Sequence, residues 1–98
     1  MRNIDEPLEK DIEAYLCRRV KALGGMPYKF TSPQRRGVPD RLCLFSGARI
    51  IFVEVKRGKE ELTKLQEYEI AALRSRGFAV AVVRSKEDVD ILFPKPVR

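Results

Sequence analysis

The chain has 98 residues, of which 44% are apolar and 35% charged, with a formal net charge of +6 and no histidine. We expect a single cytoplasmic domain, residues 1–98, because this length supports one core, no stretch is long and apolar enough to span a bilayer, and the charged N-terminus lacks the apolar core of a signal peptide. The absence of histidine excludes histidine-ligated zinc and histidine general bases, so hydrolytic chemistry would need carboxylates and a hard metal ion.

The positive charge is unevenly distributed. Residues 35–64 contain eight basic side chains against four acidic ones, whereas the first thirteen residues are acidic. Such a basic field attracts polyanions and raises encounter rates, although an ordinary solvated basic surface has the same composition. The two cysteines, Cys17 and Cys43, have no spacing typical of a disulfide or a metal site, and we interpret them as small buried hydrophobic residues.

Residues 6–23 have the apolar spacing of an amphipathic helix, with Asp5 or Glu6 as its cap, Pro7 in its first turn and Gly24-Gly25 after its end. On this helix Glu9 projects into the apolar stripe and Glu13 lies at its edge. A carboxylate in that position needs a cation, a lysine or a metal ion as its partner. The alternative is a capping or surface glutamate in a frayed first turn.

The next segments predict strands. Residues 26–32 alternate like a half-buried strand, and residues 32–37 form a polar loop. The runs 40–45 and 50–56 are separated by a turn at Ser46-Gly47. In an antiparallel hairpin a three-residue loop, residues 46–48, would pair Phe45 with Arg49 and place Asp40 opposite Glu54. A two- or four-residue loop would put Asp40 on the other face unless a bulge restored it. Because side chains alternate along a strand, Glu54 and Lys56 share one face.

The second half of the chain predicts helix, strand, helix. Thr63 and Gln66 have the spacing of a capping box, which is an alternative to a catalytic role for Gln66. The helix continues through the apolar positions 65, 68, 72 and 73 and ends at Gly77. Residues 78–83 are a continuous apolar run, typical of a strand buried on both faces and parallel to its neighbour. Ser85 caps a short helix over residues 86–92. The fold class is therefore α/β, a mixed four-stranded sheet flanked by helices in the order α-β-β-β-α-β-α.

This layout, with its motifs, resembles the VRR-NUC family of the PD-(D/E)XK nuclease superfamily, in its stand-alone virus and prophage form. The likeness extends from about Leu8 to Ile91. It rests on a glutamate-bearing first helix and on the segments Lys29-Phe30-Thr31-Ser32-Pro33, Arg36-Gly37-Val38-Pro39-Asp40-Arg41, Phe52-Val53-Glu54-Val55-Lys56 and Leu65-Gln66.

The resemblance implies a restriction-endonuclease-like fold and a Mg²⁺- or Mn²⁺-dependent, structure-selective DNA endonuclease without an organic cofactor. Stand-alone members are similar to homodimeric resolvases of four-way Holliday junctions, which would act in the cytoplasm of a bacterial host. A flap- or nick-directed nuclease of the same superfamily is one alternative. Another is a non-catalytic nucleic-acid-binding module that uses the basic loops, but it would leave the acidic side chains at the motif without a purpose.

The family pattern also implies roles for individual residues. Glu9, Asp40, Glu54 and the Val55 carbonyl would hold the metal ion, and Gln66 would join Glu9, Asp40, Glu54 and Lys56 in the catalytic set. Because adjacent carboxylates favour a charged lysine, we expect Lys56 to orient the attacking water and to stabilise the transition state as a cation rather than to act as a base. The basic residues expected to contact DNA are Arg35, Arg36, Arg41, Arg57, Lys59 and Lys64.

Overall fold

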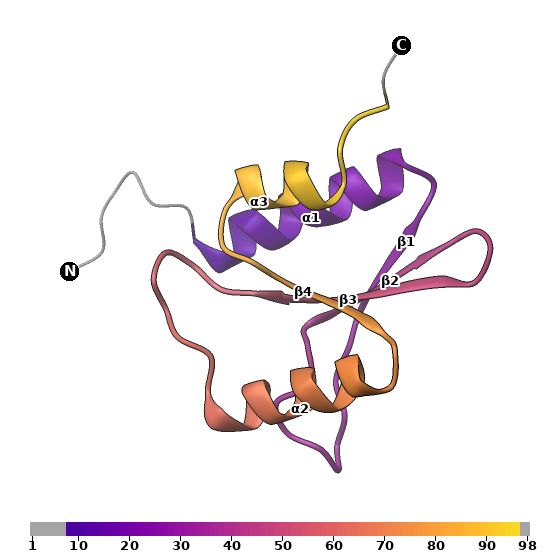
Figure 1. Ribbon diagram of the computed structural model, residues 1–98. Helices are drawn as coiled ribbons and strands as arrows, with labels where there is room; N and C mark the ends of the chain where they lie inside the picture. The colour runs from indigo at the N-terminus through magenta and orange to yellow at the C-terminus, as the bar shows by residue number, and fades with distance from the viewer. Residues whose placement is uncertain (1–7, 97–98) are drawn as a thin grey trace.

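The computed structural model describes residues 8–96 as a four-stranded mixed sheet with helices on both faces. Helices α1 and α3 cover one face and α2 covers the other (Figure 1). The predicted order of elements is confirmed. Along the chain the elements are α1 (Glu9–Ala22), β1 (Met26–Lys29), β2 (Arg41–Phe45), β3 (Arg49–Val55), α2 (Lys64–Ser75), β4 (Ala79–Val83) and α3 (Lys86–Leu92).

The β2–β3 hairpin has the register that places the motif residues together. Its three-residue loop pairs Phe45 with Arg49, and the antiparallel ladder continues to Arg41 opposite Val53. The loop closes with Gly47 at φ +78° and Ala48 at φ +59°, a left-handed pair that suits a tight hairpin turn. One step beyond the ladder, Asp40 comes opposite Glu54, as the loop length predicts.

The core forms two layers because side chains alternate across the sheet. Val53 and Val55 of β3 pack with α1 and α3, whereas Phe52 packs with Ile70 of α2 and Val80 of β4. By the same alternation Glu54 faces the α2 side. The sheet therefore separates Glu54 from the body of α1, and a residue of α1 can approach the motif only where β3 ends.

Helix α1 begins later than its apolar spacing predicts. Its N-cap is Leu8, whose backbone N–H donates to the Asp11 carboxylate at 3.2 Å. The caps expected at Asp5 or Glu6, with Pro7, lie outside the described residues. The helix also buries a charge that hydrophobic periodicity does not reveal: Arg19 donates to the Phe93 carbonyl at 2.6 Å and pairs with Asp90 at 2.7 Å, which ties α1 to α3.

Helix α2 has the predicted cap but a different buried face. The Gln66 N–H donates to the Thr63 hydroxyl at 3.1 Å and the Thr63 N–H donates to the Gln66 side chain at 2.9 Å, which confirms the capping box. Leu65 and Tyr68, expected on the apolar face, are 50% and 65% exposed. The buried residues of this helix are Glu69 and Ile70.

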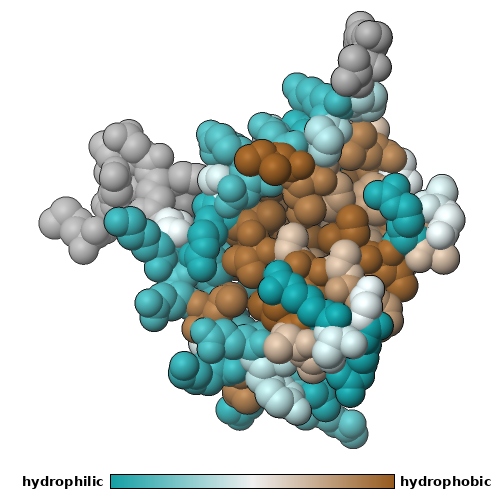
Figure 2. Space-filling model, in the orientation of Figure 1, coloured by the Kyte–Doolittle hydropathy of each residue, from teal (hydrophilic) through white to brown (hydrophobic). Residues whose placement is uncertain are grey.

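Strand β4 pairs in parallel with β3, as predicted, but it forms the edge of the sheet and is not buried on both faces. The Val83 carbonyl accepts from the Lys56 N–H, so the backbone groups of Val83 face β3. Because these groups alternate in direction along a strand, those of Val80 and Arg84 face the open side of β4. Two of these groups bind side chains: the Val80 carbonyl accepts from Arg74 and the Arg84 N–H donates to Asp88, each at 2.8 Å. Figure 2 shows hydrophobic residues gathered around this edge, between α3 and α2.

Strand β1, predicted over residues 26–32, is shorter and mostly exposed at the other edge. Of the two cysteines, Cys43 is fully buried, whereas Cys17 is only partly buried, and neither forms a disulfide. No helix within the described part of the chain is long and apolar enough to cross a membrane.

Candidate active site

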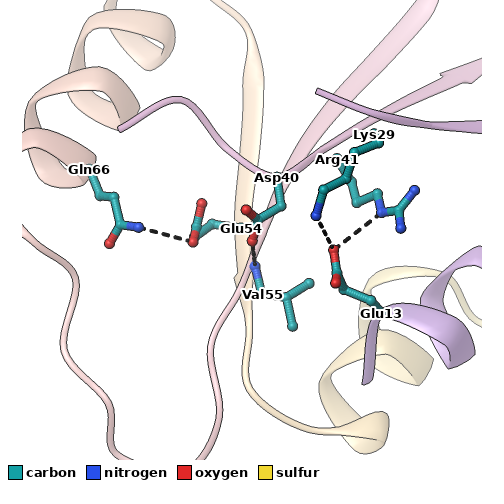
Figure 3. Close-up of polar contacts among 7 residues, drawn as sticks. All are labelled: Glu13, Lys29, Asp40, Arg41, Glu54, Val55 and Gln66. Carbon is teal, nitrogen blue, oxygen red and sulfur yellow. Dashed lines mark hydrogen bonds and ion pairs between the residues drawn. The ribbon is translucent and has the colours of Figure 1, made fainter. Parts of the chain in front are cut away.

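Asp40 lies immediately before β2 and is held by two backbone contacts. Its carbonyl accepts from the Phe30 N–H at 2.8 Å, and its carboxylate Oδ2 accepts from the Val55 N–H at 3.3 Å (Figure 3). The preceding Pro39 is fully buried. Because the N–H and C=O of one strand residue point to the same side, the Val55 carbonyl is directed toward Asp40 as well. Asp40 is thus fixed at the end of β3, beside the backbone group expected to bind metal.

Glu54 is a buried carboxylate with an unsatisfied oxygen. It is only 2% exposed; Oε2 accepts from the Gln66 amide at 3.3 Å, and Oε1 is buried without a hydrogen-bond partner (Figure 3). Burial and the negative charge of Asp40 raise its pKa from 4.5 to about 8, while Lys56 opposes this rise. A buried charged oxygen without a partner is costly, so this atom suits a proton or a cation.

Lys56 places a positive charge among these acids. It is 7% exposed, and its backbone N–H donates to the Val83 carbonyl at 3.0 Å, which ties the end of β3 to β4. Its charge favours the ionised forms of Glu54, Glu9 and Glu60 alike. One buried cation therefore stabilises the ionised forms of several carboxylates.

Glu9 is the first residue of α1, and its carboxylate lies within electrostatic reach of Asp40 and Lys56. A hydrogen bond with Glu60, partial burial and the nearby charges of Glu60 and Asp40 raise its pKa from 4.5 to about 7, against the effect of Lys56. Glu60 was not predicted from the sequence, and the only signal for it is its position four residues after Lys56. The acids thus form two contacting pairs, Asp40 with Glu54 and Glu9 with Glu60. Within residues 8–96 no three of them stand as a ready-made metal cage.

Glu13, the other carboxylate considered on the first helix, belongs to a separate ion-pair cluster. Its Oε1 accepts from Lys29 at 3.2 Å and from Arg41 at 3.3 Å (Figure 3). These two bonds tie α1 to the end of β1 and the start of β2. The electrostatic contacts with Asp40 and Lys56 are made by Glu9.

Gln66 combines the two roles that its sequence position left open. Its side-chain oxygen caps α2 by accepting from Thr63, while its amide nitrogen donates to Glu54. The loop before Asp40 packs against the same helix end: a Cβ added at Gly37 would lie 2.6 Å from the carbonyl carbon and oxygen of Leu65. The start of α2 therefore positions both the motif glutamate and the loop that carries the motif aspartate.

The residues expected to contact DNA differ in how freely they can do so. Arg41 is mostly buried and pairs with Glu13, and Arg35 pairs at 2.8 Å with Glu69, a buried acid that the sequence did not single out. Lys64 is exposed, with Glu67 at 3.7 Å. Arg36 and Lys59 are exposed, and Arg57 is partly buried.

The donor set fits a hard divalent cation. The carboxylates of Asp40 and Glu54 lie together at the end of β3. Carboxylate oxygens and backbone carbonyls, such as that of Val55, are ligands that Mg²⁺ and Mn²⁺ prefer. Burial, together with the nearby charge of Asp40, raises the pKa of the Glu54 carboxyl group, and its buried Oε1 has no hydrogen-bond partner. A cation in this position would remove both costs.

Comparison with known proteins identifies the family. A family model for the VRR-NUC domain matches residues 1–87. The chain is 45% identical over 84 residues to the protein named Putative nuclease p44 from Acyrthosiphon pisum secondary endosymbiont phage 1, covering 86% of this chain and 90% of that protein. A solved structure described as a VRR_NUC domain superposes with a TM-score of 0.82 at 36% identity, covering 86% of this chain and 91% of that one. The chain therefore belongs to the VRR-NUC family of nucleases.

Proposed function

We propose that this chain is a Mg²⁺- or Mn²⁺-dependent endodeoxyribonuclease that hydrolyses phosphodiesters in structured DNA. The observation that carries this proposal is the pairing of Asp40 with Glu54 at the end of β3, where Glu54 keeps a buried oxygen without a hydrogen-bond partner. Family membership supports the nuclease activity. A protein of this kind would act in the cytoplasm of a bacterial host.

Asp40, Glu54 and the Val55 carbonyl would hold the metal ion, with Glu9 reaching it from α1. When bound, the ion supplies Lewis acidity: it lowers the pKa of a bound water and neutralises charge on the scissile phosphate. Gln66 orients Glu54 through its amide, which leaves the other carboxylate oxygen available. Lys56, a cation among these acids, would orient the attacking water and stabilise the negative charge that develops on the phosphate oxygens.

The substrate we propose is a four-way DNA junction, cut by a homodimer. Each chain carries one such site, and two symmetric cuts require two sites related by a two-fold axis. The basic residues around the site would contact phosphates; the exposed members of that set are Arg35, Arg36, Lys59 and Lys64. Flaps and nicked duplexes are the alternative substrates within the same chemistry.

The test is cleavage of three labelled substrates, a four-way junction, a flap and a plain duplex, with Mg²⁺ or with EDTA. Wild type is compared with Asp40→Ala, and Lys10→Ala, which alters an exposed side chain of α1, serves as a surface control. We expect Mg²⁺-dependent junction cleavage by wild type and the control, and none by Asp40→Ala. Cleavage that persists in EDTA and in Asp40→Ala would contradict the metal-dependent mechanism.

A further inference from the structure

A pocket opens on α2, away from the candidate active site. It has a volume of about 290 Å³ and is lined by Arg35, Tyr68, Ala72 and Arg76. The three residues from the helix follow one another at four-residue spacing, so they lie along one side of it. Arg35 comes from the loop that precedes Asp40, and this loop packs against the start of α2 (Figure 1). The helix and the loop that carries the motif aspartate therefore form the pocket together.

The guanidinium group of Arg35 is fixed in the wall of this pocket. Its Nε donates to Oε1 of Glu69 at 2.9 Å, and its Nη2 lies 2.8 Å from the same oxygen. Glu69 is 7% exposed, whereas the Arg35 side chain remains 57% exposed. A guanidinium group has more N–H donors than one carboxylate oxygen accepts. The buried acid therefore orients Arg35 and leaves it donors for a ligand.

Arg76 supplies the net positive charge of the pocket. The charge of Arg35 is balanced by Glu69, whereas Arg76 is held by neutral groups: its Nη1 donates to the Ala72 carbonyl at 2.8 Å and to the Ser75 hydroxyl at 3.3 Å. These bonds keep the guanidinium group beside Ala72, at the pocket wall. A phosphate group is attracted by this charge and accepts charge-assisted hydrogen bonds from guanidinium groups.

Tyr68 adds an aromatic surface to the same pocket. It is 65% exposed and belongs to neither core cluster of residues 8–96, so core packing does not account for a tyrosine at this position. An exposed ring can stack with a nucleobase of any type, provided that the base has left its own stack. A positive charge and an exposed ring in one pocket fit a nucleotide, with its phosphate at the arginines and its base on the ring.

The pocket continues from the active site along α2. Gln66 donates to Glu54 at the start of this helix (Figure 3). At a rise of about 1.5 Å per residue, Ala72 and Arg76 lie about 9 and 15 Å further along the helix axis. One strand of DNA carries a phosphate about every 3.4 Å of its axis. A strand bound at Glu54 therefore reaches the pocket within about three to five nucleotides.

We propose that this pocket binds an unpaired nucleotide of the DNA substrate, with its phosphate at Arg35 and Arg76 and its base stacked on Tyr68. This inference rests on the proposed nuclease function and adds the feature that selects structured DNA. A flap contains unpaired nucleotides, and bases at the crossover of a junction can leave their stacks, whereas a plain duplex presents phosphates alone. Tyr68 thus determines specificity, and Arg76 serves any DNA.

The test compares affinities for a flap, a four-way junction and a plain duplex, with Ca²⁺ in place of Mg²⁺. We expect Tyr68→Ala to weaken binding of the flap and the junction at least about fivefold and to leave duplex affinity unchanged. Tyr68→Phe keeps the ring and should match wild type. Arg76→Gln should weaken binding of all three and lower its salt dependence. The matched controls are Tyr28→Ala and Arg18→Gln, which alter exposed side chains of β1 and α1.

A second readout is the fluorescence of 2-aminopurine placed along the unpaired strand, which wild type should quench more than Tyr68→Ala does. Equal flap affinity in Tyr68→Ala and Tyr28→Ala, or equal losses for flap and duplex, would overturn the nucleotide pocket. Mg²⁺-dependent cleavage by wild type would in that case still uphold the proposed function. A loss confined to the flap and the junction, in a wild type that cuts no DNA in Mg²⁺, would uphold the pocket and overturn the nuclease function.

Discussion

Lys56 is a buried ammonium group surrounded by acids, and its function can be separated from DNA binding. It is 7% exposed, so it is poorly placed to hold the polyanion directly. We expect Lys56→Ala to reduce single-turnover junction cleavage by orders of magnitude and to leave junction affinity, measured with Ca²⁺ in place of Mg²⁺, nearly intact. Lys56→Met controls for the lost packing of the side-chain stem. A parallel loss of binding and cleavage would show that Lys56 serves to hold DNA.

Glu54 makes stability depend on pH in an unusual direction. Its pKa is raised from 4.5 to about 8, so between these values the folded protein holds a proton that the unfolded chain has released. Stability in EDTA should therefore fall as the pH rises through this window. We expect Tm to drop by several degrees between about pH 5 and pH 8, and Mg²⁺ to raise Tm more at the higher pH because it replaces the proton.

Glu54→Gln is the control for this pH dependence, because it removes the titrating group while keeping the acceptor for Gln66. Its Tm should vary less with pH than that of wild type, and Mg²⁺ should stabilise it less. A wild-type profile that coincides with that of Glu54→Gln would mean that this carboxylate ionises normally in the folded protein.

At the scale of elements, the N-terminus of α2 joins folding to the site through one side chain. Gln66 caps the helix with its oxygen and binds Glu54 with its nitrogen. Glutamate is equally suited to the capping box but cannot donate to a carboxylate. Gln66→Glu should therefore leave the free energy of unfolding within about 1 kcal/mol of wild type in Mg²⁺ and reduce cleavage at least tenfold. Gln66→Ala, which removes both contacts, should reduce both quantities; unchanged activity in Gln66→Glu would contradict the positioning role.

The loop that delivers Asp40 depends on its close approach to α2 at Gly37. This glycine has φ +83°, and an added Cβ would lie 2.6 Å from the Leu65 carbonyl. Gly24 is a matched control, with φ +82° and nothing within 4 Å of the same Cβ. Gly24→Ala should cost about 1 kcal/mol of unfolding free energy, from backbone strain alone. Gly37→Ala should lower the free energy of unfolding by more than this and should also slow cleavage. If denaturant titrations give the same loss for both variants, the loop at Gly37 moves away from Leu65 without cost.

The elements also show where sequence reasoning reaches its limit. Local signals found the caps at Thr63 and Ser85 and the hairpin turn after Phe45, because each depends on neighbours in the chain. The buried face of α2 was missed because Arg35 neutralises Glu69 from a distant loop, and a hydrophobic pattern does not register such a partner. The edge position of β4 is likewise a property of the whole sheet, and an apolar run alone does not reveal it.

The candidate site likewise contains residues that local sequence rules predict and residues that only tertiary contacts place. Asp40 and Glu54 followed from strand alternation and hairpin length, both of which are short-range rules. Glu60 lies in a loop whose backbone is bound by Arg84, the residue after β4, so no local pattern marks it. Glu13 and Glu9 lie four residues apart on one helix, and only the tertiary partners Lys29 and Arg41 assign Glu13 to a different cluster.

At the scale of the whole molecule, the proposed dimer would carry one site in each chain, so the number of strands cut would report the number of active subunits. We expect wild type to elute and scatter light as a dimer. A mixed dimer of one wild-type chain and one Asp40→Asn chain, purified through two different tags, should nick a four-way junction on one strand only. Paired cuts by the mixed dimer would show that one site acts twice, and a monomeric wild type that still resolves junctions would contradict the two-fold arrangement.

The side chains of Arg74 and Asp88 bound along the open side of β4 have a consequence for self-association. Each occupies a backbone group that an incoming strand would need, so this edge of the sheet is less suited to templating further strands despite its apolar surroundings. Fibril-like growth is thereby discouraged in a protein whose edge composition would otherwise invite it. Copies that meet at this edge would do so mainly through side-chain contacts, and such contacts can separate again without breaking a shared ladder of backbone hydrogen bonds.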